Sequence, residues 1–315
     1  MRVMLITNPF ATSTTQEGRD ALARALSERH EVDLQPTTHR GHAGELGVQA
    51  VAEGFDAVVV HGGDGSVNEL VNGMLGTPEL QGGTVRPAAA DLPAIGVVPG
   101  GNANVFARSL GVNRRSDAAV GQLLAGLDAG RRRTISLGHT LNRWFLFNAG
   151  MGMDAIVVRK IDEARRNGKP VTNLRYVSAA VSSFLSKEDP TPNFRVEVPT
   201  GEAVDGARFA FVSNTGPWTY LGLRAIATNP GTTFDSGLGL FASTSVSALP
   251  NLGLGAQLLT GSSNPRASHL YRDDDVEWIR FTADAPADVQ MDGEYLGTYD
   301  SLEFGCVKNV IDVVV

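Results

Sequence analysis

Residues His61–Leu70 read HGGDGSVNEL, a stretch whose small residues cannot fill a core. The apolar run Phe55–Val60 precedes it and is typical of a buried strand. After it, apolar residues fall at helical spacing, namely Val67, Leu70, Val71, Met74 and Leu75. A helix start offers unpaired N–H groups and a partial positive charge, and glycines let an anion approach closely. The stretch therefore predicts an anion-binding turn between strand and helix; a plain glycine-rich connection is the alternative.

A second stretch repeats this order of strand, glycine turn and helix. The apolar run Ala94–Val98 is followed by Gly100-Gly101-Asn102-Ala103-Asn104, which opens another predicted helix. Parallel strands end at the same edge of an open α/β sheet, and such sheets bind ligands there. We therefore expect both glycine turns, together with Asn8-Pro9 after the first strand, to lie at one edge. No Gly-Lys-Ser or Gly-Lys-Thr occurs, which excludes a Walker-type loop.

The first third of the chain alternates between strand and helix patterns. Strands are expected at Val3–Thr7, Val32–Leu34, Phe55–Val60 and Ala94–Val98, and helices after residue 14, near 45–53, after the first glycine turn and at 102–110. Thr14 and Glu17 form a capping-box pattern before the first helix, and Gly111 would end the last. Residues 77–92 read as a loop. This alternation predicts a mostly parallel sheet with helices on both faces.

Beyond about Arg133 the pattern changes to short strand-like runs separated by turns. The runs are Trp144–Asn148, Phe194–Val198, Arg208–Ser213, Leu238–Ser243, Val276–Thr282 and Val289–Met291. Helical patterns interrupt them at 154–166 and 174–185. We therefore predict an α/β domain at 1–134 and a mainly antiparallel β domain at 135–315. The last strand, at about 303–315, is compatible with either domain.

Composition limits the classes of function. The chain has 315 residues and a net charge of −7, so general binding to nucleic acid is not expected. Cys306 is the single cysteine, which excludes an internal disulfide and suits a reducing, cytoplasmic setting. No run approaches the roughly 18 apolar residues of a membrane-spanning helix, and Val3–Ile6 is too short for a signal peptide. We expect a cytoplasmic protein that meets membranes only peripherally.

Two further patterns have simpler explanations than ligand binding. Gly150-x-Gly152-x-x-Ala155 matches the dinucleotide-binding pattern formally, but it lies in the β-rich half without a βαβ unit. His39 and His42 lie among glycines, with Glu45 the nearby carboxylate. We expect loop histidines there rather than a metal site.

Asp64 lies inside the first glycine turn, where a carboxylate would repel a phosphate. Three partners would make it acceptable: a ribose, a metal-bound water or a backbone donor. We assign Asp64 to magnesium, bound through water.

These residues resemble the signatures of the soluble bacterial diacylglycerol kinase-like lipid kinases, whose superfamily includes sphingosine and ceramide kinases. Gly62–Glu69 is similar to GGDG[TS]-x-N-E, and Pro99–Arg108 is similar to P-x-G-T-x-N-D-F-A-R. Asn8-Pro9 resembles the N-P after the first strand, and Met291–Glu294 resembles the late L-D-G-E. NAD kinases and phosphofructokinases share GGDG alone, whereas the whole set in this order is specific.

The resemblance implies an α/β nucleotide-binding domain, a β-sandwich domain that faces lipid, and an active site in the cleft between them. It also implies phosphate transfer from ATP, with Mg²⁺, to the hydroxyl of diacylglycerol or a related lipid alcohol. The nucleotide-binding positions carried over are Asn8, Pro9, Phe10, Ala11, Thr12, Thr37, Gly62, Gly63, Asp64, Gly65, Ser66, Val67, Asn68, Glu69, Gly100, Gly101, Asn102 and Asn104. Asp292 or Glu294 would be the general base. Taken alone, Asp292-Gly293 reads as a hairpin turn.

Two stretches depart from the family pattern. The threonine and aspartate of the second block are Asn102 and Val105 here. Asn102 can still donate to a phosphate, whereas Val105 cannot join a magnesium–water network. The family's D-D-G-L, which holds a structural magnesium, appears as Asp235-Ser236-Gly237-Leu238. This puts the second metal site, aligned with Thr233, Ser236 and Leu238, in doubt.

The lipid side is marked by a basic segment. Its residues are Arg159, Lys160, Arg165, Arg166 and Lys169. It is either a docking site for an anionic membrane surface or a solvated helix face that also carries Asp162 and Glu163. An exposed strand edge in the β-rich half could pair two subunits as a homodimer. Three classes of function remain: a lipid kinase, a kinase for a soluble substrate, and a degenerate member that binds without catalysis.

Overall fold

The computed structural model describes residues 1–78, 86–152, 155–156, 158–159, 163 and 192–315. The chain divides into two compact units. The first comprises Met1–Leu137, Asn142–Trp144 and Val307–Val315, and the second comprises Gly138–Leu141 and Phe145–Cys306. The domain boundary near residue 134 stays a prediction.

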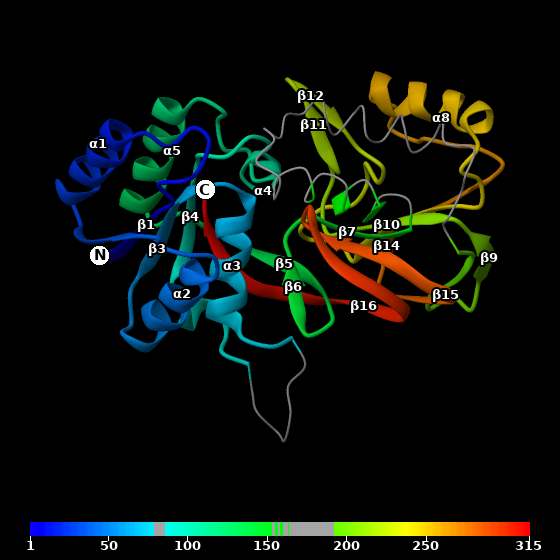
Figure 1. Cartoon of the computed structure of the whole chain (residues 1–315). Coiled ribbons are helices and arrows are strands. Elements are labelled where there is room, and N and C mark those ends of the chain that lie inside the picture. Colours follow the sequence, from blue (N-terminus) through cyan, green and yellow to red (C-terminus); the bar gives the residue numbers. More distant parts are fainter. Residues whose placement is uncertain (79–85, 153–154, 157, 160–162, 164–191) are drawn as a thin grey trace. The chain divides into compact units, whose positions relative to one another are not determined.

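The first unit alternates strands and helices, as predicted from the sequence (Figure 1). Its elements are β1 (Arg2–Thr7), α1 (Gln16–Ser27), β2 (Glu31–Pro36), α2 (His42–Ala52), β3 (Ala57–Gly62), α3 (Asp64–Leu75), the 3₁₀-helix η1 (Ala89–Asp91), β4 (Ala94–Pro99), α4 (Val105–Ser109) and α5 (Ser116–Asp128). The strand order is β4-β3-β1-β2, and all these pairs are parallel. The end of β16 (Glu294–Val314) adds a parallel strand beside β4, with Val313 opposite Ile95.

The core of this unit lies between the sheet and the helices α1 and α5. Alternate residues of the strands, such as Val3 and Leu5 of β1, point toward this face because side chains alternate along a strand. Leu22 and Leu26 of α1 cover them together with Leu123 of α5. The helices α2 and α3 lie on the other face (Figure 1).

The helices α2 and α3 cross at glycines. A Cβ placed on Gly73 would lie 2.0 Å from the carbonyl oxygen of Gly44, and one placed on Gly47 would lie 2.8 Å from that of Leu70. Any larger side chain at these positions would push the two backbones apart. The close crossing fixes α3, and thereby the first glycine turn, against the sheet.

Three local predictions in this unit need correction. The N-cap of α1 is Thr15, whose Oγ1 accepts from the N–H of Gly18 at 3.1 Å, and not Thr14. The helix α4 begins at Val105 rather than residue 102, because Asn104 is left-handed with φ +47°. No element was expected at α5, although Ala119, Leu123 and Leu127 repeat at helical spacing.

The second unit is antiparallel and β-rich, as the sequence pattern predicted. Its elements, with the strand that leads into it, are β5 (Arg132–Thr140), β6 (Arg143–Phe145), β7 (Asn148–Gly152), β8 (Phe194–Glu197), β9 (Ala203–Ala207), β10 (Phe209–Ser213), β11 (Thr219–Leu221), β12 (Arg224–Ile226), β13 (Leu238–Ser243), α8 (Ala248–Thr260), β14 (Leu270–Val276), β15 (Trp278–Met291) and β16. The strand order is β14-β13-β10-β7-β15-β16, and β8 pairs with β15 and β9. Phe194, Phe281 and Phe304 lie in its buried core.

The predicted run Trp144–Asn148 is divided between β6 and β7. The N–H groups of Leu146, Phe147 and Asn148 bond to the Asp292 carboxylate, so Leu146 and Phe147 do not extend either strand. The predicted run 276–282 is likewise shared between β14 and β15.

The helix α8 was not predicted, because Pro250, Gly253 and Gly255 are poor helix formers. Packing overrides this weak propensity: Leu254 and Leu258 contact an aromatic cluster of the sheet. The predicted helices at 154–166 and 174–185 lie largely outside the described residues, as does most of the basic segment. Within the part of the chain that the structure describes, no helix is long and apolar enough to cross a bilayer.

Candidate functional site

The carboxyl edge of the parallel sheet brings together the residues predicted to bind nucleotide. Asn8 follows β1, and its N–H donates to the carbonyl of His61 at 3.0 Å. The N–H of Thr37, after β2, donates to the carbonyl of Thr7 at 2.8 Å. The N–H of Gly100 donates to the carbonyl of Gly62 at 2.8 Å, which joins the two glycine turns. We call Asn8, Gly62–Ser66 and Gly100–Asn104 the glycine edge.

The two glycine turns touch backbone to backbone. A Cβ on Gly101 would lie 2.7 Å from the Cα of Gly63, and one on Gly63 would lie 3.3 Å from the Cα of Gly101. A Cβ on Gly100 would lie 3.2 Å from the Cα of Gly62. These glycines are therefore needed by the fold itself, whether or not an anion binds. The sequence of either turn alone does not reveal this reason, because the contact joins residues far apart in the chain.

Gly65 differs from its neighbours. It lies in the first turn of α3, it is exposed, and a Cβ on it would meet nothing within 4 Å. The N-cap of this helix, Gly63, provides no side-chain cap for the first turn. An open helix start without a side-chain cap is the arrangement that accepts an anion.

Side chains from neighbouring turns brace the glycine edge. The Nδ2 of Asn8 donates to Ser66 Oγ at 3.0 Å, and its Oδ1 accepts from the N–H of Phe10 at 2.9 Å. Asn104 closes the second turn on itself: its Oδ1 accepts from the N–H of Gly101, and its Nδ2 donates to the Gly101 carbonyl. The predicted positions Asn8 and Asn104 therefore shape the turns directly.

The Asp64 carboxylate binds backbone donors, which was the last of the three partners considered for it. Its Oδ2 and Oδ1 accept from the N–H groups of Val105 and Phe106, each at 3.0 Å. Burial raises the pKa of Asp64, while the bonds from Phe106 and Val105 and the charge of Arg108 oppose that rise. Asp64 thus caps α4, whose own N-cap Asn104 makes no side-chain bond to the helix.

The buried side chain of Asn68 joins α3 to β6. Its Nδ2 donates to the carbonyl of Trp144 at 3.1 Å. Asn72, one turn later, accepts from the N–H of Trp144 at 2.9 Å and donates to its carbonyl at 3.1 Å. The side chain of Asn68 therefore anchors β6 to α3, and its contact with nucleotide stays a prediction.

The other predicted nucleotide positions lie around the edge. Thr37, Ser66 and Val67 are buried, Pro9, Ala11 and Glu69 are partly exposed, and Phe10, Thr12 and Asn102 are exposed. Phe10 and Thr12 belong to the loop after β1. That loop is tied to the second glycine turn, because the N–H of Ser13 donates to the carbonyl of Gly100 at 2.8 Å.

In the second unit, Asp292 and Gly293 form a two-residue hairpin turn between β15 and β16. Met291 and Glu294 are paired, and φ is +48° at Asp292 and +77° at Gly293. Positive φ at both positions is the hallmark of a type I′ turn. The hairpin reading of Asp-Gly is confirmed, and a catalytic role for Asp292 stays a prediction.

The Asp292 carboxylate is held by three successive N–H groups. Leu146 donates to Oδ2 at 2.7 Å, and Phe147 and Asn148 donate to Oδ1 at 3.0 and 3.1 Å. An ionised carboxylate offers about four acceptor positions, so at most about one remains for a further donor. The orientation of this side chain is therefore fixed by the β6–β7 connection.

Two buried amides fix the same turn, and neither was among the predicted site residues. Gln290 accepts from the N–H of Gly293 at 3.0 Å and donates to Asn148 Oδ1 at 3.1 Å. Asn148 in turn donates to the carbonyl of Trp218 at 3.0 Å. The pattern of apolar and polar residues along β15 does not indicate that Gln290 is buried. Its burial follows from the register of the β15–β16 hairpin.

The loop aligned with the second metal site is closed by a hydroxyl. Ser236 Oγ lies 2.9 Å from the carbonyl oxygens of both Thr233 and Gly237, and it accepts from the N–H of Thr233. Leu238 is buried at the start of β13. No group of three or more His, Cys, Asp or Glu able to hold a metal occurs among the described residues. Ser236 thus closes this loop through the loop's own backbone groups, and a metal site here stays a prediction.

Comparison with known proteins gives the class of the chain. Residues 2–139 match the family model of the diacylglycerol kinase catalytic domain. A diacylglycerol kinase of Mycobacterium tuberculosis is 30% identical over 222 residues, which cover 68% of this chain and 65% of that protein. A diacylglycerol kinase of Bacillus subtilis is 29% identical over 155 residues, 48% of this chain and 46% of that protein. The matched region thus spans less than two thirds of these relatives' own lengths.

Solved structures agree on the fold. A diacylglycerol kinase structure from Bacillus anthracis str. Sterne has a TM-score of 0.68 at 17% identity and covers 99% of this chain and 96% of its own. A second structure from the same strain has a TM-score of 0.77 at 19% identity and covers 99% and 94%. The match of residues 2–139 places this part of the chain in the diacylglycerol kinase catalytic-domain family.

Proposed function

We propose that this protein transfers the γ-phosphate of MgATP to the hydroxyl of a lipid alcohol such as diacylglycerol. The observation that carries the proposal is the glycine edge, where two strand–glycine–helix turns are joined through their backbones. Membership of a lipid kinase family supports the reaction class, since the relatives from Mycobacterium tuberculosis and Bacillus subtilis are diacylglycerol kinases.

Phosphoryl transfer requires mainly positioning and charge stabilisation. The start of α3 would attract the phosphates, because a helix N-terminus carries a partial positive charge and unpaired N–H groups. Gly65 leaves that start open, and the contact between Gly63 and Gly101 holds the two turns in register. Magnesium would arrive as part of the substrate, since in kinases it is bound mainly by phosphates, water and one or two carboxylates.

Asp292 or Glu294 would accept the proton of the attacking hydroxyl, which is typically worth about 10²–10⁴-fold in rate. Asp292 already accepts three N–H bonds, whereas Glu294 is the first residue of β16 and is partly exposed. The two residues therefore predict different variant behaviour.

We expect Asp292→Asn to lose stability as well as turnover, because its amide would present N–H groups to backbone donors. Glu294→Gln leaves that network intact and should change turnover only if Glu294 is the base. Turnover and thermal unfolding measured on both variants separate the roles. A role for Asp292 as base is contradicted if Asp292→Asn keeps near-normal turnover.

The proposed reaction is tested by offering labelled ATP and magnesium with several acceptors. Diacylglycerol vesicles, a mixed lipid extract, NAD and fructose 6-phosphate cover the lipid and soluble classes. We expect label in an organic-extractable phospholipid product. Label in NADP or a sugar phosphate would identify a soluble-substrate kinase. No transfer to any acceptor would point to a member that binds without catalysis, consistent with Val105 and Ser236 at the two departures.

A further inference from the structure

The helix α8 presents an unusual surface in the second unit. Its inner face, with Leu254 and Leu258, packs on an aromatic cluster that includes Phe209, Phe211 and Phe241. Its outer face exposes Leu252 by 65% and Leu259 by 48%, with Ala256 between them. These three residues are spaced i, i+4 and i+7, so they share one side of the helix. The helix is therefore apolar on both faces.

A second apolar projection arises from the same cluster. Trp218 packs against the cluster beneath α8 and directly precedes the hairpin of β11 and β12. The tip of this hairpin exposes Leu221 by 43% and Leu223 by 80%. We call Leu252, Ala256 and Leu259, together with Leu221 and Leu223, the apolar surface. Both groups of exposed apolar side chains are thus carried by elements that pack on the same aromatic cluster.

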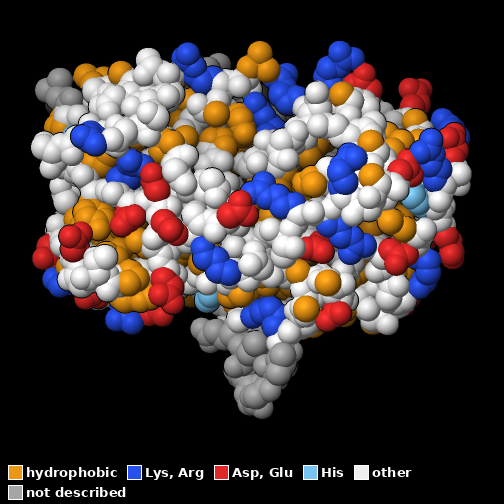
Figure 2. All heavy atoms as spheres, turned by 180° about the vertical axis from the view of Figure 1, so that it is seen from behind, with side chains coloured by type: hydrophobic (Ala, Val, Ile, Leu, Met, Phe, Trp, Pro, Cys, Tyr) orange, Lys and Arg blue, Asp and Glu red, His pale blue; other side chains and the backbone are white. Residues whose placement is uncertain are grey.

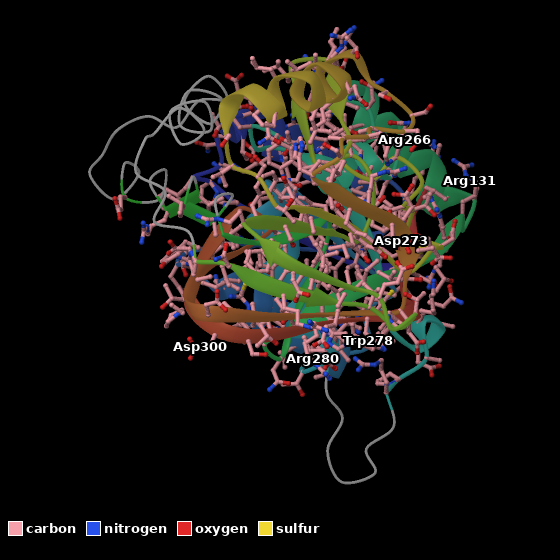
Figure 3. All side chains as sticks on the ribbon, turned by 90° about the vertical axis from the view of Figure 1, so that its right-hand side faces the viewer. Arg131, Arg266, Asp273, Trp278, Arg280 and Asp300 are labelled. Carbon is pink, nitrogen blue, oxygen red and sulfur yellow. The ribbon has the colours of Figure 1, made fainter. Side chains whose placement is uncertain are left out.

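The segment that contains α8 carries few charges and these are positive, although the protein as a whole has a net charge of −7. From Ser236 to Arg272 the only Asp, Glu, Lys or Arg residues are Arg266 and Arg272. Arg272 is paired with Asp274 at 2.5 Å. Arg266 is exposed, and its backbone is tied to α8 through two bonds of 2.9 Å with the Gln257 side chain (Figure 3). At the hairpin tip the corresponding residue is Arg224, which is also exposed.

The space-filling view agrees with this distribution of charge. Acidic and basic side chains alternate over much of the face in Figure 2, whereas the described residues at its upper left, on the side of α8, are mostly orange and white. An exposed apolar helix whose own segment, residues 236–272, carries arginines and no carboxylate suits the interface of an anionic bilayer.

We propose that the apolar surface docks on the interface of an anionic membrane, with Leu252, Leu259 and Leu223 inserted and Arg224 and Arg266 at the head groups. The inference deepens the proposed function and rests on it in one respect, because a lipid alcohol is reached at a bilayer. It assigns the contact to α8 and the hairpin tip and does not involve the basic segment near Arg159.

Vesicle sedimentation tests the inference without catalysis. The full chain is mixed with phosphatidylcholine vesicles, with or without phosphatidylglycerol, in the absence of ATP and diacylglycerol. We expect binding to the anionic vesicles. Leu252→Gln and Leu259→Gln should each weaken it by about tenfold, the factor that corresponds to burial of one leucine. Arg266→Gln should reduce the difference between the two kinds of vesicle. Val48→Gln is the matched control, since Val48 is 57% exposed on α2 of the first unit.

Each outcome decides the inference. Because Leu252 and Leu259 are exposed, their variants should unfold at the same temperature as the wild type. Thermal denaturation of each variant checks this. Unchanged vesicle binding by the Leu252→Gln, Leu259→Gln double variant overturns the proposal. So does a loss of self-association by that variant, which would make the surface a subunit interface. If the wild type binds vesicles but phosphorylates no lipid, the proposed function fails and the docking surface stands.

Discussion

Asp64 shows that a residue inside a ligand-binding signature can serve the fold. Both of its carboxylate oxygens accept N–H groups of α4, so the first glycine turn also orders the second. The sequence indicated that a carboxylate in this turn needs a special partner. It could not name the partner, because Val105 and Phe106 are 41 and 42 residues away.

Asp64→Asn is expected to destabilise the protein by about 1–3 kcal/mol, because the amide leaves one buried N–H without an acceptor. Urea unfolding measures the change. Asp20→Asn is the control, since Asp20 is an exposed carboxylate on α1. Equal stability of the two variants would show that the Asp64 bonds do not hold α4.

The buried side chain of His61 should make the stability of the folded protein depend on pH. Burial lowers the pKa of this histidine, and the charge of Arg19 lowers it further. As pH falls below about 6.5, the unfolded chain therefore binds a proton that the folded chain resists. Stability should then fall with decreasing pH, by up to about 1.4 kcal/mol per pH unit, until the folded histidine also becomes protonated.

The check is the stability difference between the wild type and His61→Gln at several pH values. Above pH of about 7 the difference should be constant, and below about 6.5 it should shift in favour of the variant. If the stability difference between the wild type and His61→Gln stays constant down to about pH 5, burial does not lower the pKa of His61 as stated.

At the scale of elements, the crossing of α2 and α3 positions the first glycine turn. Gly73→Ala would bring a Cβ within 2.0 Å of the Gly44 carbonyl oxygen, so the helices must separate. Overpacking of this kind typically costs about 1–3 kcal/mol. We expect a lower unfolding temperature and weaker binding of MgATP, measured by thermal denaturation and calorimetry. Gly121→Ala on α5, whose Cβ meets nothing within 4 Å, should be neutral or stabilising.

Elements were predictable where a local pattern and the fold agree. The parallel strands of the first unit are short apolar runs bounded by turns, and each was found within a few residues of its position. The helix α8 was missed because glycine and proline argued against it, and its stability comes from packing on Phe209, Phe211 and Phe241. The division of Trp144–Asn148 was missed because its cause is a carboxylate far away in sequence.

For the whole molecule, the sequence was enough to predict two architectures and one ligand-binding edge. The register of β1, β3 and β4 brings Asn8, Gly63 and Gly101 together as expected, because parallel strands end on the same side. The sequence did not show which residues of this edge are required by the fold itself. Gly63 and Gly101 are required by contact between turns, and Asn68 by the anchoring of Trp144. Gly65 is the glycine of this edge at which a Cβ would meet no neighbouring atom within 4 Å, so packing does not explain it.

The most direct test of phosphate binding at the start of α3 is the affinity for MgATP of Gly65→Ala, measured by calorimetry beside Gly121→Ala. Both glycines are exposed in helices with open space around them, so both alanine variants should be as stable as the wild type or slightly more stable. We predict that Gly65→Ala weakens MgATP binding by roughly tenfold or more, while Gly121→Ala leaves it unchanged. Equal affinities in the two variants would contradict the placement of the phosphates at the start of α3.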